Sequence, residues 1–360
     1  MLVHICCSVD SHYFLTRLRE EYPDEELIGY FYDPNIHPVE EYELRFLDVA
    51  YSFEMLNIKL IKGVYDVSYW LEKVKGFEHE PERGKRCDIC FEDRLEKSII
   101  KAKELKQNSF TTTLLISPQK SQNKLQELGE KLAKENNISF IFKDYRSGEG
   151  LFFQAKAVKT NSLYRQNYCG CLYALLPQRQ TQQKLATELF SAISKQVLPN
   201  SAKARIKTFE KRNALAKEKK DFALVKEKFL AYNLLNAKIT LKNEVLASYP
   251  LLYSTLTKKK TKAKIEFFKN NIFYLNKEAI KFISLKTFND LGNFSYKSVK
   301  ELMFLAPSFE EELKLRHKIT GFFDLSAIFV LEEKDIKKQE QNFEFTFEAK
   351  IYEDIKEVLI

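Results

Sequence analysis

The stretch LVHICCSVDS at residues 2–11 decides the fold. Leu2–Cys7 is mostly apolar and has the length of a short buried strand. Ser8, Asp10 and Ser11 follow as a polar turn that opens a helix. A strand that leads directly into a helix is the first half of a βαβ unit, so the same order is expected downstream.

The rest of the first half repeats this order. Further strands are predicted at Leu27–Tyr32, Ile58–Ile61, Thr111–Ile116 and Ile138–Phe142, and helices at 40–56, 68–75, 91–105 and 125–134. This alternation predicts an α/β fold with a mostly parallel sheet. In such sheets ligands bind beyond the carboxyl ends of the strands, and Cys6 and Cys7 lie at the end of the first strand.

The pattern changes after Leu172. It predicts a helix over 178–195, a hinge at Leu198–Ser201, a long basic helix over Ala202–Tyr232, a hairpin over Ile265–Leu275, a buried run at Phe322–Leu331 and an alternating strand over Phe343–Ile351. We therefore expect three parts. They are a cysteine-containing α/β domain (1–180), a basic helical linker (181–232) and a small α+β C-terminal domain of unknown role (233–360).

Composition and charge narrow the class of protein. The 360 residues are 44% hydrophobic, which excludes global disorder. A signal peptide and a membrane-spanning run are absent from the sequence, so a soluble cytoplasmic protein is expected. Residues 1–180 have 25 basic and 27 acidic side chains, whereas 181–320 have 28 and 13. The basic half suits a polyanionic partner such as nucleic acid, although a lysine-rich source proteome explains it equally well.

All six cysteines lie in the first half, in three close pairs: Cys6-Cys7, Cys87-x-x-Cys90 and Cys169-Gly170-Cys171. Their spacing leaves iron–sulfur, zinc and dithiol sites open, because a second CxxC hook and a thioredoxin pattern are both missing. Asp10 is a further metal ligand or a helix N-cap. Gly170 allows a sharp turn that aims both neighbouring sulfurs at one cavity. Arg165, Lys85 and Arg86 either neutralise an anionic site or are surface charges.

A series of motifs in chain order resembles the QueH family of epoxyqueuosine reductases over residues 1–177. The series comprises Cys6-Cys7, Phe31-Tyr32-Asp33-Pro34-Asn35-Ile36 with Glu40-Glu41-Tyr42, Val74-Lys75-Gly76, Arg86-Cys87-Asp88-Ile89-Cys90-Phe91, Arg94-Leu95, Thr111-Thr112-Thr113-Leu114, Ser117-Pro118 and Leu163-Tyr164-Arg165-Gln166-Asn167-Tyr168-Cys169-Gly170-Cys171. The chain departs from the family at Ser8-Val9, where Ala-Pro is common, but this change spares the cysteines. No counterpart of the C-terminal half is apparent.

The resemblance implies a HUP-like α/β domain that reduces epoxyqueuosine to queuosine at the wobble position of the tRNA anticodon. It also implies a 4Fe–4S cluster with a second iron beside it. Carried over by position, Cys87, Cys90, Cys169 and one of Cys6 and Cys7 would bind the cluster. The other cysteine of that pair, Cys171 and Asp10 would bind the second iron, which would polarise the epoxide oxygen.

The same reading assigns roles to polar and aromatic residues near the cysteines. Tyr168 or water would supply a proton, with packing as the alternative role of Tyr168. Arg165, Gln166 and Asn167 would recognise the base, and Tyr32 and Tyr42 would stack on it unless they are buried. The basic stretch from Lys203 to Lys220 would bind the tRNA body. A G-x-G-x-x-G fingerprint is missing from the sequence, so the electron donor would be another protein or a small reductant.

Two other classes of function remain open. A cluster-dependent tRNA thiolase would share the fold, but it should bind ATP, and Cys6–Ser11 lacks the glycines that hold phosphates. A zinc-stapled tRNA-binding module without catalysis would hold zinc instead of iron.

Overall fold

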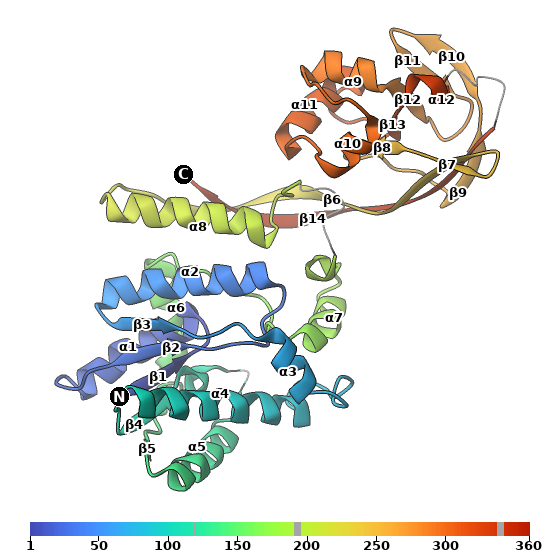
Figure 1. Cartoon of the computed structure of the whole chain (residues 1–360). Helices are drawn as coiled ribbons and strands as arrows, with labels where there is room; N and C mark the ends of the chain where they lie inside the picture. Colours follow the sequence, from blue (N-terminus) through green and yellow to red (C-terminus); the bar gives the residue numbers. More distant parts are fainter. Residues whose placement is uncertain (119, 191–195, 337–341) are drawn as a thin grey trace. The chain divides into compact units, whose positions relative to one another are not determined.

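The computed structural model describes residues 1–118, 120–190, 196–336 and 342–360, and the chain forms two compact units (Figure 1). The first unit comprises Met1–Leu189, Arg205–Val225 and Leu359–Ile360, and the second comprises Phe190–Ala204 and Lys226–Val358. Among the described residues, no helix is both long and apolar enough to cross a membrane.

A five-stranded parallel sheet forms the centre of the first unit. Its strands are β1 (Leu2–Ile5), β2 (Ile28–Phe31), β3 (Lys59–Lys62), β4 (Ser109–Thr112) and β5 (Ser139–Phe140), in the order β3-β2-β1-β4-β5. β1 is the central strand, and its Leu2 pairs with Ile28 on one side and Phe110 on the other. The order reverses at β1, which is where doubly wound sheets bind ligands. The expected parallel sheet is confirmed.

Helices cover both faces of this sheet (Figure 1). The helices of residues 1–189 are α1 (Ser8–Glu21), α2 (Val39–Leu56), α3 (Val67–Lys73), α4 (Lys85–Glu104), α5 (Gln122–Asn136), α6 (Gly150–Thr160) and α7 (Leu172–Thr181). Of these, α3 and α7 pack against each other, through Trp70 and Tyr173. Val3 and Ile5 on one face of β1 pack with side chains of α1 and α2. Leu2 on the other face packs with Leu95 and Ile99 of α4. Because strand side chains alternate, one strand contributes to both cores.

Three boundaries in the first unit differ from the sequence-based expectation. The strand expected at Thr111–Ile116 ends at Thr112, whose side chain caps a 3₁₀ turn over Thr113–Ile116. α4 begins at Lys85, so the CxxC pair lies in its first turns. The helix expected over 178–195 is confirmed only for residues 178–181, which form the end of α7, and its continuation to residue 190 is wrong. The chain leaves α7 after Thr181, and Gln183 adopts a left-handed conformation (φ 53°). Residues 191–195 lie outside the described residues.

The predicted basic linker also differs from the structure. A helix, α8, extends over Ala202–Lys217, but the expected continuation to Tyr232 is wrong, because Lys219 is left-handed (φ 53°) and Leu224–Leu241 forms strand β6. β6 lies beside β14 (Phe343–Leu359), so its backbone groups are satisfied by strand pairing instead of helix formation. Most of α8 belongs to the first unit.

The second unit is an α+β domain, as expected. A mixed sheet has the order β10-β11-β12-β13-β8, and a second sheet has the order β7-β6-β14-β9. The remaining strands are β7 (Glu244–Leu246), β8 (Ser248–Pro250), β9 (Lys260–Ala263), β10 (Ile265–Lys269), β11 (Ile272–Leu275), β12 (Lys281–Ser284) and β13 (Ile328–Leu331). The helices of the second unit are α9 (Leu285–Gly292), α10 (Val299–Phe304), α11 (Phe309–Thr320) and α12 (Glu333–Ile336). A short 3₁₀ turn at Thr187–Leu189 belongs to the first unit.

The aromatic pattern of the second unit explains its core. Phe343, Phe345 and Phe347 alternate along β14 and are buried against residues of the other sheet, including Phe282 and Phe329. The predicted hairpin is confirmed, and its turn residues Asn270 and Asn271 both have positive φ. The buried run expected from Phe322 begins only at Ala327, since Phe322 and Phe323 are exposed.

Candidate metal centre

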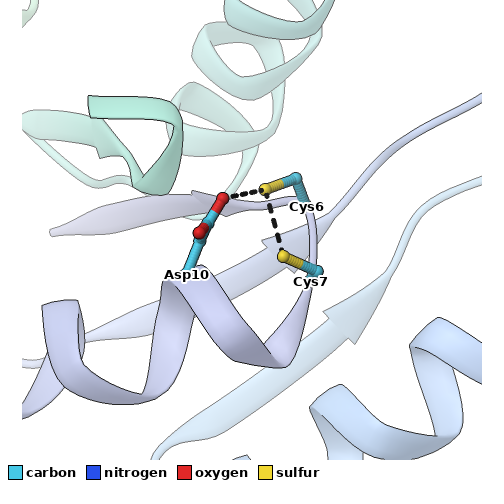
Figure 2. Close-up of side chains that lie close together, drawn as sticks. All are labelled: Cys6, Cys7 and Asp10. Atoms are coloured by element: carbon cyan, nitrogen blue, oxygen red, sulfur yellow. Dashed lines mark hydrogen bonds between the residues drawn. The ribbon is translucent and has the colours of Figure 1, made fainter. Parts of the chain in front are cut away.

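The first two cysteines and Asp10 form a compact group at the carboxyl end of β1 (Figure 2). Cys6 follows the strand, Cys7 is the N-cap residue of α1, and Asp10 lies in the first turn of that helix. The Cys6 sulfur is 3.8 Å from the Cys7 sulfur and 3.5 Å from Oδ2 of Asp10. The strand-to-helix turn therefore brings two thiols and a carboxylate to one point, as the sequence suggested.

Burial makes this group unfavourable for negative charge. It raises the pKa of Asp10 to about 6, against hydrogen bonds from Cys6, Cys7 and Gln154 that lower it. The pKa of the Cys6 thiol is well above its usual value, first because of its hydrogen bond with Cys7 and then because of burial. Three potential anions in a buried space would be stabilised by a cation, so the donors suit a metal ion.

Cys87 and Cys90 lie in the first turns of α4. Burial raises the pKa of both thiols, to about 12 for Cys90. Negative charge on Cys171, Cys169 or Cys87 would raise the pKa of Cys90 further. Among the described residues, a tight metal-binding geometry is present only at Cys6, Cys7 and Asp10.

A sharp turn at Gly170 positions the last cysteine pair. Gly170 has a φ of 101°, and a Cβ there would lie 2.9 Å from Cγ1 of Ile36. Its carbonyl accepts a hydrogen bond from the backbone N–H of His37 at 2.8 Å. Arg45, which is buried and paired with Glu41, donates to the carbonyl of Cys169. Glycine is thus required for the close approach, as the sequence suggested.

Two cations beside the cysteines were not identified from the sequence. Arg94, one turn after Cys90, is buried and interacts electrostatically with Cys90, Cys169 and Cys6. Lys120 has its Nζ 3.5 Å from the Cys169 sulfur. Burial alone would raise the pKa of Cys169, but Lys120 and Arg94 outweigh it, and the pKa is lowered. The position of Arg94 four residues after Cys90, on the same face of a helix, was the available signal.

The Asp33-Pro34-Asn35 motif holds Arg94 in place. The Asp33 carboxylate is 2.9 Å from Nη2 of Arg94, and the side-chain oxygen of Asn35 accepts a hydrogen bond from the same nitrogen. Both residues are buried and follow directly after β2. The motif thus has a structural role in setting the charge beside the cysteines.

The cations predicted to flank the cysteines have different surroundings. Arg86 is buried, and its Nη1 donates to the carbonyls of Phe77, Glu78 and Glu80. It therefore supports the loop before α4 and is not available to bind phosphate. Lys85 and Arg165 are exposed.

The predicted substrate-binding residues fall into two groups. Arg165 and Asn167 are exposed and Gln166 is half-buried, although the Asn167 side-chain oxygen already accepts from Arg179. Tyr32 and Tyr42 are buried, at 4% and 0% exposure. Their rings belong to the core around β2 and α2 and are not available to stack on a base.

Tyr168 is also a packing residue in this structure. It is buried, and its hydroxyl donates a 2.6 Å hydrogen bond to the carbonyl of His37. The guanidinium groups of Arg45 and Arg179 lie over its ring. Burial raises its pKa far above the usual value. A hydroxyl with its proton committed to a backbone carbonyl is a poor proton donor to a substrate.

Comparisons with known proteins agree with the motif series. The family model for epoxyqueuosine reductase QueH matches residues 1–176. Epoxyqueuosine reductase QueH of Helicobacter pylori is 38% identical over 353 residues, which cover 94% of this chain and 95% of the relative. The C-terminal half, for which the motifs indicated no counterpart, is therefore matched in this relative as well.

A shorter relative and a solved structure complete the comparison. The QueH of Thermotoga maritima is 32% identical over 191 residues, covering 52% of this chain and 95% of the relative. The solved structure is that of the U34-tRNA thiolase NcsA of Methanococcus maripaludis with its [4Fe-4S] cluster. It is 15% identical with a TM-score of 0.33, and the match covers 59% of this chain and 73% of that one. A similarity this low supports no conclusion about function. With the match over almost the whole length of the Helicobacter protein, the chain belongs to the epoxyqueuosine reductase QueH family.

Proposed function

We propose that this protein reduces epoxyqueuosine in tRNA to queuosine, the last step of queuosine biosynthesis. The observation that supports this most is the match to QueH relatives together with six free cysteines, all in the catalytic unit. The reaction removes the epoxide oxygen as water and leaves an alkene, which takes two electrons and two protons. The electrons would come from an external protein or small reductant.

A 4Fe–4S cluster with a second iron fits the donor set. Cys87, Cys90, Cys169 and one of Cys6 and Cys7 would bind the cluster, and the remaining thiols and Asp10 would bind the second iron. Six thiols and one carboxylate suffice for both, and Arg94 and Lys120 would offset the negative charge of a thiolate-bound cluster. When bound, these groups would supply electrons singly and a Lewis acid for the oxygen.

The chain's own residues prepare the site. Gln154 donates to Oδ1 of Asp10 at 2.9 Å and fixes the carboxylate, and Asp33 and Asn35 fix Arg94. Arg165 and Gln166 remain candidates for reading the modified base, since the Gln166 side-chain oxygen is buried and has no hydrogen-bond partner within the described part of the chain. Because the Tyr168 hydroxyl is engaged, we assign the protons to water.

The proposal also covers how the tRNA is bound and in which cellular compartment the enzyme acts. The exposed lysines between 203 and 220 would bind phosphates of the tRNA body. The cysteines are free, as is usual for proteins of the reducing cytoplasm, and we place the enzyme there.

The test is anaerobic turnover by the full chain. We expect the protein, after cluster reconstitution and with dithionite as reductant, to convert epoxyqueuosine to queuosine in tRNA, measured by nucleoside analysis. Cys90→Ser should lose the cluster absorbance and the activity together, because it removes a ligand. A fully loaded, active Cys90→Ser protein would refute the ligand assignment, and an inactive, fully loaded wild type would refute the function.

A further inference from the structure

Helix α6 has a buried face that contacts Asp10 through Gln154, and an opposite face that is exposed, aromatic and basic. Phe152, Lys156 and Lys159 are exposed, with Phe152 at 64%, and lie at positions i, i+4 and i+7 of the helix. This spacing places them on one face. Gln154 and Val158 are buried on the opposite face. The helix was not predicted from the sequence, so none of these residues was assigned a role.

A direct hydrogen bond connects this helix to the site. Gln154 Nε2 is 2.9 Å from Oδ1 of Asp10 and also donates to the carbonyl of Val9. Phe153, the residue before Gln154, is stacked against Tyr13 of α1 with the ring centroids 6.4 Å apart. The ring of Phe152 packs edge-on against the ring of Phe153. The packing of Phe153 on α1 and the hydrogen bond of Gln154 therefore hold α6 against Asp10.

Covering the exposed ring of Phe152 with a partner's apolar surface would be favourable. Lys156 and Lys159 have no carboxylate within ion-pair distance among the described residues, so their charge is available to an anion. Alternation of an aromatic ring with free cations is how proteins hold single-stranded nucleic acid, since rings stack on bases and lysines bind phosphates.

We propose that the α6 face (Phe152, Lys156 and Lys159) binds the anticodon loop of the substrate tRNA, with an unpaired base stacked on Phe152. The inference rests on the proposed function for the identity of the RNA. The modified base must leave the loop to reach the buried thiols, and a neighbouring base stacked on Phe152, about one helix width from Asp10, would keep the loop open. The face thereby replaces Tyr32 and Tyr42 as the stacking platform.

Tryptophan fluorescence tests the stacking directly. The chain has a single tryptophan, Trp70, which is 1% exposed. Phe152→Trp adds an exposed indole, and we expect its emission to be quenched when the full-length protein binds an unmodified RNA hairpin of the anticodon arm. Phe323→Trp is the matched control, because Phe323 is 97% exposed in the second unit, and it should not respond.

Binding constants complete the test. Phe152→Ala should weaken hairpin binding roughly fivefold to a hundredfold, the usual range for loss of one base stack, and leave the salt dependence unchanged. Lys156→Ala with Lys159→Ala should instead reduce the slope of log K against log salt by about 1.4, at about 0.7 per phosphate contact. Phe323→Ala should bind as the wild type does.

Equal quenching at positions 152 and 323, or wild-type affinity of Phe152→Ala, would overturn the proposal. So would a change in oligomeric mass of Phe152→Ala with unchanged RNA affinity, which would identify the face as a contact between protein copies. These measurements need no turnover. An inactive enzyme with a quenched Phe152→Trp therefore refutes the reductase assignment alone, and an active enzyme without quenching refutes only the RNA-binding face.

Discussion

At the scale of single residues, the arrangement of the cysteines depends on a few backbone and charge requirements. Gly170 has no Cβ, which permits both its φ of 101° and its contact with Ile36 and Arg45. Arg45 in turn binds the carbonyls of Tyr168 and Cys169. Adding a Cβ at position 170 would therefore displace the loop that positions the thiols of Cys169 and Cys171.

Gly170→Ala is expected to reduce metal binding. Gly148→Ala is a matched control, because Gly148 also has positive φ (61°) but open space where a Cβ would lie. Both changes should cost about 1–2 kcal/mol of stability from the left-handed backbone. Only Gly170→Ala should also lower the iron bound per chain after reconstitution. Equal iron content in the two variants would show that the close approach at Gly170 is not required.

At the scale of elements, α8 is a structural part of the catalytic unit. Arg212 and Asp48 of α2 are both fully buried and form an ion pair at 2.5 Å. Asp48 also accepts from the backbone N–H of Tyr164 and from the hydroxyl of Ser8, the residue after Cys7. The buried pair thus connects α8 to the beginning of α1, beside the first two cysteines.

Arg212→Met should destabilise the first unit by about 3–5 kcal/mol, because it leaves the Asp48 carboxylate buried without its cation. Lys217→Met on the same helix breaks an exposed pair with Glu54 and should cost less than about 1 kcal/mol. Urea unfolding followed by the emission of Trp70, which lies in the first unit, measures both. Similar midpoints for the two variants would contradict a bracing role for α8, whereas partial recovery in Arg212→Met with Asp48→Asn would support it.

At the scale of the whole molecule, local patterns predicted the parallel sheet and the position of Cys6 and Cys7, because apolar periodicity reports which face of an element is buried. They failed where tertiary contacts decide. Leu224–Leu241 has enough apolar residues for a helix, but it is a strand because β14, more than a hundred residues later, lies beside it. Likewise, the spacing of Arg94 from Cys90 places both on one face of α4, but the burial of Arg94 depends on Asp33 and Asn35, which follow another strand and which no local pattern connects to it.

The iron and acid-labile sulfide content of the anaerobically purified and reconstituted full chain, read with its visible spectrum, tests the central claim most directly. An epoxyqueuosine reductase with the proposed centre should contain about four to five irons and about four sulfides per chain and absorb as a 4Fe–4S protein does. One zinc per chain without sulfide, even after reconstitution, would contradict the account and would favour a zinc-stapled tRNA-binding protein.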